Sequence, residues 1–228
     1  MGAVPIVDSV PTAAGRATPV NGRDRILDAS ATRFAELGFA ETSLRLIAAD
    51  VEMKAGSLYY HFGSKDDLFV SVLERGIALM NESFDSTEQH EPDHEDGRER
   101  LAAHVRAHLQ VLHGNFAYTS LHVTSFRNAP ETVRAAIVPV RDAYEAKWTE
   151  LLTSVLSSRS EQEIGILRLV LFGAMNSSIE WFDAGRGNLD EFAGVVTDQF
   201  WNGVRHPTDT AHSPTSSEPD TITQHGIK

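Results

Sequence analysis

The chain has 228 residues, which is enough for one or two domains with a sizeable hydrophobic core. It contains no cysteine, so disulfides and thiolate metal sites are excluded, and this suits a reducing cytoplasm. Its net charge of −12 argues against a broadly basic, polyanion-binding surface. The first twenty residues lack the pattern of a secretory signal, and the apolar runs are shorter than the roughly 18 residues of a membrane span. We expect a cytoplasmic protein that makes no membrane contact.

Composition divides the chain into four parts. Residues 1–19 carry no periodic pattern and are predicted to be a flexible arm, and the Thr/Ser/Pro-rich segment 207–228 is predicted to be a disordered tail. Between them, apolar residues recur at helical spacing and nothing alternates for long with period two. The pattern predicts an all-α protein of about nine helices, with one domain over 20–80 and a second over 81–206.

The first predicted helix begins at a cap near Asn21 and stops at Gly38. Thr42 is expected to cap the second helix, a short third helix covers 54–60, and Ser64 caps the fourth. The polar, acidic run 86–97 is expected to be a loop. Longer apolar stripes then predict helices near 101–113, 117–127, 130–156 and 164–184, and a last helix opening near 188.

The segment "KAGSLYYHFGSKDDL", residues 54–68, places aromatic and basic side chains together where one short helix ends and the next begins. The second and third helices are joined by a few residues, which is the geometry of a helix-turn-helix. Tyr59, Tyr60, His61 and Lys65 are then expected to face a phosphate backbone, because hydroxyl and ammonium groups donate to phosphate oxygens. Phe62 is expected to turn inward as an anchor.

The longer stretch "TSLRLIAADVEMKAGSLYYHFGSKDDLF" resembles the DNA-binding motif of TetR-type transcriptional regulators, with the resemblance covering 20–80 and its motif 43–62. The resemblance implies a homodimeric repressor that reads a palindromic DNA operator and carries a helical C-terminal domain for a small-molecule inducer. By residue match, the candidate DNA contacts are Thr42, Ser43, Arg45, Lys54, Ala55, Gly56, Ser57, Tyr59, Tyr60, His61 and Lys65.

Two residues depart from the family pattern. Glu52 stands where the turn usually carries glycine, and Lys54 stands where the recognition helix often begins with serine. Lysine cannot cap a helix as serine does, although it can reach a phosphate or a guanine. Residues 20–80 hold 7 basic and 9 acidic residues, a net of −2, so we expect DNA affinity to depend on a few placed donors.

The C-terminal helices carry sparse polar groups at or near apolar faces, as small-molecule sites do. The candidate ligand-binding residues are His104, His108, Arg127, Asn176 and Trp181. The segment "GAMNSSIEWFDAGRGNLDEFA" resembles TetR-type regulators of lipid and steroid catabolism, many of which respond to acyl-coenzyme A. We therefore expect a largely apolar inducer, either an acyl-coenzyme A or another hydrophobic compound. The helices at 160–183 and 188–204 are expected to form the dimer interface, with Leu171 and Phe200 in it.

Alternatives remain open at this point. Asn176, Ser177 and Ser178 are equally compatible with a polar pocket and with simple packing. His104 and His108 share one helical face and are compatible with a metal pair, but no third ligand is identifiable. No pattern of nucleophile, paired carboxylates or nucleotide loop is found, so we expect neither an enzyme nor a cofactor. The competing functions are a DNA-binding protein without an inducer and a histidine-metal enzyme.

Overall fold

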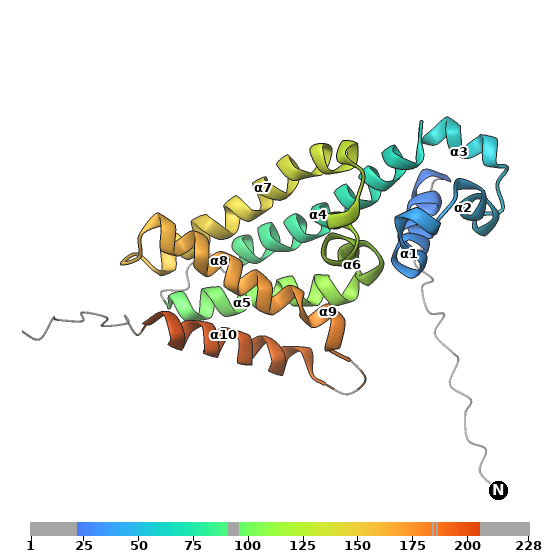
Figure 1. Cartoon of the computed structure of the whole chain (residues 1–228). Coiled ribbons are helices and arrows are strands. Elements are labelled where there is room, and N and C mark those ends of the chain that lie inside the picture. The colour runs from blue at the N-terminus through green and yellow to red at the C-terminus, as the bar shows by residue number, and fades with distance from the viewer. Residues whose placement is uncertain (1–21, 91–95, 184, 186, 206–228) are drawn as a thin grey trace, which may run out of the picture.

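A computed structural model describes residues 22–90, 96–183, 185 and 187–205, and within these residues all regular structure is helical (Figure 1). The prediction of an all-α chain is confirmed for this part. The expected arm, the cap at Asn21 and the expected tail lie outside the described residues. In chain order the helices are α1 (Gly22–Glu41), α2 (Leu44–Asp50), α3 (Ala55–His61), α4 (Lys65–His90), α5 (Gly97–Gly114), α6 (Phe116–Thr124), the 3-10 turn η1 (Phe126–Asn128), α7 (Glu131–Val155), α8 (Glu161–Asn176), α9 (Ser178–Trp181) and α10 (Leu189–Arg205).

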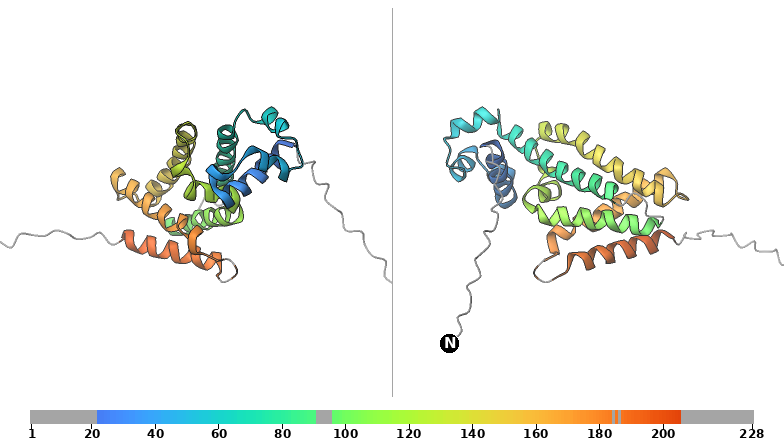
Figure 2. Two further views of the ribbon diagram at one scale, coloured as in Figure 1. Left: turned by 45° about the vertical axis from the view of Figure 1, so that its right-hand side comes forward. Right: turned by 180° about the vertical axis from the view of Figure 1, so that it is seen from behind.

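Helices α1, α2 and α3 gather at one end of the molecule with the first turns of α4 (Figures 1 and 2). Their shared core is made of fully buried apolar side chains, including Ile47 and Leu58. Phe34 and Phe69 pack edge to face with ring centroids 4.8 Å apart, which ties α1 to α4. Gly38 has φ +80°, and this left-handed residue breaks the regular turn of α1 before Glu41.

The start of α2 differs from the prediction by one residue. Ser43 is the N-cap, and its hydroxyl oxygen accepts from the Leu46 N–H at 3.2 Å. Thr42 is instead buried, and its hydroxyl lies 2.8 Å from the Gly38 carbonyl oxygen and 3.1 Å from that of Arg33. Gly38 has non-helical backbone angles, and the Thr42 hydroxyl turns inward toward this break, which leaves the cap position of α2 to Ser43.

Helix α4 connects the two ends of the molecule. It packs against α1 near its start and against α5, α6 and α7 further along, so the expected boundary at 80/81 falls inside one continuous helix. The prediction of a loop over 86–97 was wrong for residues 86–90, which form the last turn of α4. Glu88 in that turn accepts from Arg100 of α5 at 2.9 and 3.0 Å, a tertiary contact that local composition does not reveal.

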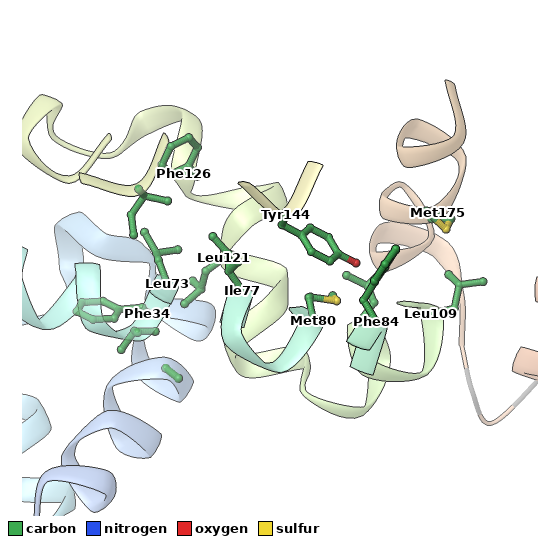
Figure 3. Packing of buried hydrophobic residues seen from close by; sticks show 14 of the residues in the cluster. Phe34, Leu73, Ile77, Met80, Phe84, Leu109, Leu121, Phe126, Tyr144 and Met175 are labelled. Atoms are coloured by element: carbon green, nitrogen blue, oxygen red, sulfur yellow. The ribbon is translucent and has the colours of Figure 1, made fainter. Parts of the chain in front are cut away.

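The rest of the chain is a bundle in which α4 lies among α5, α6 and α7, while α10 packs on α5 and α8 (Figure 1). Figure 3 shows Ile77, Met80 and Phe84 of α4 meeting Leu121, Tyr144 and Leu109 in one continuous core. The expected helix over 164–184 is divided, since α8 ends at Asn176 and α9 is a separate single turn. In the described part of the chain, no helix is both long and apolar enough to span a membrane.

Candidate DNA-binding surface and ligand cavity

Helix α3, the predicted recognition helix, is fixed by two buried side chains and exposes most of the others. Leu58 is fully buried, and Phe62, which follows the helix, is buried under the guanidinium of Arg23 at 4.4 Å. The expectation that Phe62 anchors the helix inward is confirmed. On the other side, Tyr59 is 58% exposed and Tyr60 is 88% exposed. Exposure of two adjacent tyrosines is costly in apolar area unless another surface covers them.

Most of the predicted DNA contacts share this surface. Ser43, Arg45, Lys54, Gly56 and Ser57 are exposed, and Ala55 and His61 are half-buried. Lys54 occupies the N-cap position of α3 without a side-chain cap bond, so its ammonium group is free of that role. The seven exposed positions, including both tyrosines, lie on α2, α3 and their immediate ends.

Two predicted contacts are placed elsewhere. The Lys65 ammonium donates to the backbone oxygens of Phe39 at 2.9 Å and Thr42 at 3.1 Å, and it lies 4.2 Å from the Phe39 ring centroid. A third carbonyl, that of Ala40, is at 3.4 Å, so the three N–H bonds of lysine are all used inside the protein. Lys65 and the buried Thr42 therefore hold the α1–α2 junction that supports the surface, and neither is free to reach DNA in this conformation.

A cavity of about 200 Å³, partly open to solvent, lies in the bundle against α4. Most of its surface is apolar, and each of five helices contributes to its wall. The lining residues are Gly76, Ile77, Met80, His108, Leu112, Thr119, His122, Val123, Arg141, Tyr144, Glu145, Leu169, Phe172 and Asn176. Figure 3 shows Ile77 and Met80 of α4 near Tyr144 of α7, in the part of the core next to the cavity.

Three polar side chains that line the cavity form a hydrogen-bonded chain with His108 at its centre. The Tyr144 hydroxyl donates to His108 Nδ1 at 2.9 Å, and His108 Nε2 donates to Asn176 Oδ1 at 3.3 Å. This arrangement gives the ring the Nε2–H tautomer, because an amide oxygen only accepts. Burial lowers the pKa of His108 to about 4 and raises that of Tyr144, so both groups are neutral at physiological pH.

His122 of α6 also lines the cavity. Its Nε2 donates to the Leu73 carbonyl oxygen at 2.8 Å, which joins α6 to α4, and burial lowers its pKa to about 4. Its Nδ1 is buried and has no partner in the described part of the chain. Gly76 makes this close packing possible, since a Cβ there would lie 3.1 Å from His122 Nε2 and from the Tyr118 backbone oxygen.

Only two of the five predicted ligand residues, His108 and Asn176, line the cavity. His104 is buried behind it, with Nε2 3.1 Å from Glu88 Oε1 and its ring 4.4 Å from that of Phe84. Arg127 is exposed, and its carbonyl oxygen accepts from Arg134. Trp181 is 59% exposed and packs on Phe192. These three contribute to packing or to the surface around the bundle.

The remaining cavity residues were missed. Arg141, Tyr144 and Glu145 share one face of α7 at spacings of three and four, a signal that the apolar stripe of that helix obscures. His122 sits in a short helix with few polar residues, and its pairing with Leu73 depends on a tertiary contact. Within the described ranges, no group of three side chains is arranged to hold a metal ion, and His104 and His108 are engaged as above.

Two family models match large parts of the chain. Residues 26–72 match "Bacterial regulatory proteins, tetR family", and residues 94–204 match "Tetracyclin repressor-like, C-terminal domain". The chain belongs to the TetR family. The first match covers the helix-turn-helix and the second covers α5 to α8, four of the five helices that line the cavity. This TetR-family protein is a DNA-binding transcription regulator.

Individual proteins agree with the family. The transcriptional repressor KstR2 of Mycolicibacterium smegmatis is 23% identical over 171 residues, which are 73% of this chain and 82% of that protein. The crystal structure of FadR from Bacillus subtilis in complex with stearoyl-CoA has a TM-score of 0.66 at 20% identity, covering 78% of this chain and 97% of that one. AibR, in complex with isovaleryl coenzyme A and operator DNA, has a TM-score of 0.64 at 23% identity, covering 78% and 96%. At these identities the two structures show a shared fold.

Proposed function

We propose that this TetR-family regulator is a dimeric repressor that leaves its operator when a mainly apolar small molecule fills the cavity. The observation that carries the proposal is the position of α4. This helix begins at Lys65, which bonds to the α1–α2 junction that supports the DNA-binding surface, and its residues Gly76, Ile77 and Met80 line the cavity. A shift of one rigid helix therefore reaches both sites.

The DNA-binding surface is proposed to consist of the exposed side chains on α2 and α3. Lys54 and Arg45 carry the charged donors on it and Tyr60 carries a phenol, and all three groups bond to phosphate oxygens. Ser57 adds a hydroxyl on α3. The surface is small and the first domain is slightly acidic, so binding should rest on these few contacts. Because few phosphates are neutralised, its affinity should fall only modestly as salt is added.

The dimer is proposed to form through α8 and α10, which pack against each other. Ile166, Leu169 and Val170 of α8 are more than half exposed, and their spacing places them on one face. Val195 of α10 is 57% exposed as well. Exposed apolar side chains gathered on two packed helices are typical of an interface. Leu171 and Phe200, which were expected in it, are instead buried within the single chain at 1% and 8% exposure.

Helix α6 is proposed to pass the ligand's effect to the DNA-binding end. Thr119, His122 and Val123 of this helix line the cavity. From the same helix, His122 bonds to Leu73 of α4, and the Tyr118 hydroxyl donates to Asp28 Oδ1 of α1 at 2.5 Å. A ligand that displaces α6 would pull on both helices, and in a dimer this changes the spacing of the two recognition helices.

The ligand's apolar character is supported by the lining and by the two structural neighbours that are complexes with acyl-coenzyme A ligands. The size sets a limit, because a 150 Å³ apolar cavity accommodates benzene and this one measures about 200 Å³. The cavity as described therefore holds a compact apolar group, and a long acyl chain would require it to open further.

The experiment is a release titration. Operator duplexes are first selected from a random pool by the full-length protein, and the bound complex is then titrated with acyl-coenzyme A thioesters, free fatty acids, steroids and planar aromatics. We expect at least one hydrophobic compound to release the DNA. If small polar metabolites alone release it, the ligand class is wrong. If nothing does, the alternative of a DNA-binding protein without an inducer is favoured.

The docking surface is tested separately by Tyr60→Ala. Loss of its contacts should weaken binding to all duplexes by about 1 to 2 kcal/mol without lowering the free energy of unfolding, because the side chain is exposed. Lys65→Ala is the matched comparison, and we expect it to lower stability as well, since it removes three internal hydrogen bonds. If anisotropy titrations give Tyr60→Ala the same duplex affinity as wild type, the proposed DNA-binding surface is wrong.

A further inference from the structure

The part of α7 that lines the cavity carries an arginine and a glutamate that do not pair closely with each other. Arg141 and Glu145 lie one turn apart, and both line the cavity. The distance from Arg141 Nη2 to Glu145 Oε1 is 3.8 Å, which is too long for a hydrogen bond. Glu145 has a nearer partner on α8, because Arg168 Nη2 lies 3.1 Å from Glu145 Oε2. The Glu145 carboxylate therefore lies near two guanidinium groups, and it is closer to that of Arg168 than to that of Arg141.

Arg141 is the group left without an acceptor. Its guanidinium lies 4.7 Å from the Phe126 ring centroid, and within the described part of the chain it makes no hydrogen bond. Stacking on a ring fixes the plane of a guanidinium while leaving its five N–H donors available. Arg168 differs, since it also donates to Thr149 Oγ1 at 2.9 Å and to the Glu145 carbonyl oxygen at 3.3 Å. The free donors at the cavity are those of Arg141.

The surroundings of Arg141 leave room for one more anion. Asp142, the next acid on α7, is exposed and does not line the cavity. His122, on the wall formed by α6, is neutral at physiological pH and adds no competing charge. Among the cavity residues, Glu145 is the sole carboxylate, and it is already engaged by Arg168.

We propose that Arg141 holds an oxyanion group of the ligand, and that this ligand is a compact, otherwise apolar organic acid. The inference rests on the proposed function, because it names the chemistry of the same cavity. A carboxylate fits the planar fork of arginine with two parallel hydrogen bonds, and the apolar lining accepts the remainder of the molecule.

Size and overall charge refine the ligand class. A cavity of about 200 Å³ fits an aromatic ring with a short substituent or a chain of about six to eight carbons, by comparison with the 150 Å³ that holds benzene. Residues 81–228 hold 12 basic and 22 acidic residues, a net of −10, and this field opposes the accumulation of several negative charges. A single carboxylate is therefore favoured over the phosphates of a coenzyme A thioester as the group at Arg141.

The test is isothermal titration of the full-length protein with benzoate, phenylacetate and octanoate, each paired with its methyl ester, and with octanoyl-coenzyme A. We expect at least one acid to bind more tightly than its ester. In Arg141→Gln that acid should bind about 10- to 100-fold more weakly, because a charge-assisted bidentate pair is lost, while the ester is unaffected. Arg134→Gln, on the same helix but outside the cavity, should behave as wild type. Circular dichroism verifies that both variants fold.

Each result decides between the hypotheses. If esters bind as tightly as acids and Arg141→Gln changes neither, the inference is wrong, although release of the operator by either compound would leave the proposed function standing. If octanoyl-coenzyme A binds more tightly than octanoate and depends on Arg141, the oxyanion is a phosphate and the free-acid class is overturned. If no compound binds and none releases the operator, the inference and the proposed function both fail.

Discussion

Glu52 adopts a left-handed backbone conformation that is unfavourable for a residue other than glycine. It is the one non-glycine residue with positive φ in the described part of the chain, at +56°, and it lies in the turn between α2 and α3. The left-handed conformation costs an L-residue about 1 to 2 kcal/mol, because Cβ approaches the carbonyl oxygen. The family pattern has glycine here, so the departure seen in the sequence is a strained position in the fold.

We therefore predict that Glu52→Gly raises the free energy of unfolding by about 1 kcal/mol. It should also tighten non-specific duplex binding at low salt, since a carboxylate next to the recognition helix is removed. Glu52→Ala is the matched control, because it removes the charge and keeps the strain. Urea unfolding and anisotropy titration separate the two effects, and equal stability of the glycine and alanine variants would show that the backbone is not strained.

His108 gives the folded protein a pH dependence. Its pKa falls from 6.5 to about 4 on folding because of burial, so the unfolded chain binds the proton more tightly. The stabilisation is complete above about pH 6.5 and is lost as the pH falls toward 4, by an amount on the order of 3 kcal/mol. His108→Gln should make this part of the stability curve less steep in urea unfolding at stepped pH, and the slope that is left includes that of His122, whose pKa burial also lowers to about 4. His90→Gln, at an exposed position of α4, should leave the slope as in wild type.

At the scale of helices, α6 acts as a bridge because it is short and bonded on two sides. The Tyr118 hydroxyl reaches Asp28 of α1, and the raised pKa of this tyrosine follows from burial together with that carboxylate. Tyr118→Phe removes the bond while keeping the ring. We predict normal operator affinity and normal ligand affinity, with several-fold more ligand required for half-release, because the coupling between two sites is what is weakened. Thr153→Ala, which removes a bond within α7, is the control in the same release titration.

Sequence patterns predict some elements well and others poorly, for physical reasons. The apolar stripes of α4, α5 and α7 predict buried faces, because periodicity reports burial directly. The end of α4 depends on a tertiary partner, because Glu88 accepts from Arg100 of α5, and the inward turn of Thr42 depends on the non-helical backbone at Gly38. The same holds for the site. His108 and Asn176 are polar residues beside apolar stripes and are predictable from the sequence. Arg141 is not, because what distinguishes it is a tertiary contact: the Glu145 carboxylate pairs with Arg168 of α8 instead.

At the scale of the whole molecule, the charge and the apolar surface lie apart from the DNA-binding end. Of the net charge, −10 belongs to residues 81–228 and −2 to residues 20–80, so most of the like charge lies outside the sequence of the first domain. The exposed apolar side chains of α8 and α10 belong to that part too. A dimer formed there would place two recognition helices at a fixed separation, as a palindromic operator requires.

This arrangement leads to the prediction that Val170→Asp separates the dimer without unfolding the chain. Val170 is 57% exposed in the single chain, so an aspartate there remains solvated in a monomer but would be desolvated in the proposed interface. Wild type should sediment at twice the 25.0 kDa of one chain, and the variant at 25.0 kDa with unchanged helical content. Leu171→Asp is the contrasting variant, because that side chain is buried within the chain and its replacement should unfold the protein. A dimeric Val170→Asp protein that still binds the selected operator as tightly as wild type would show that the subunits associate through another surface.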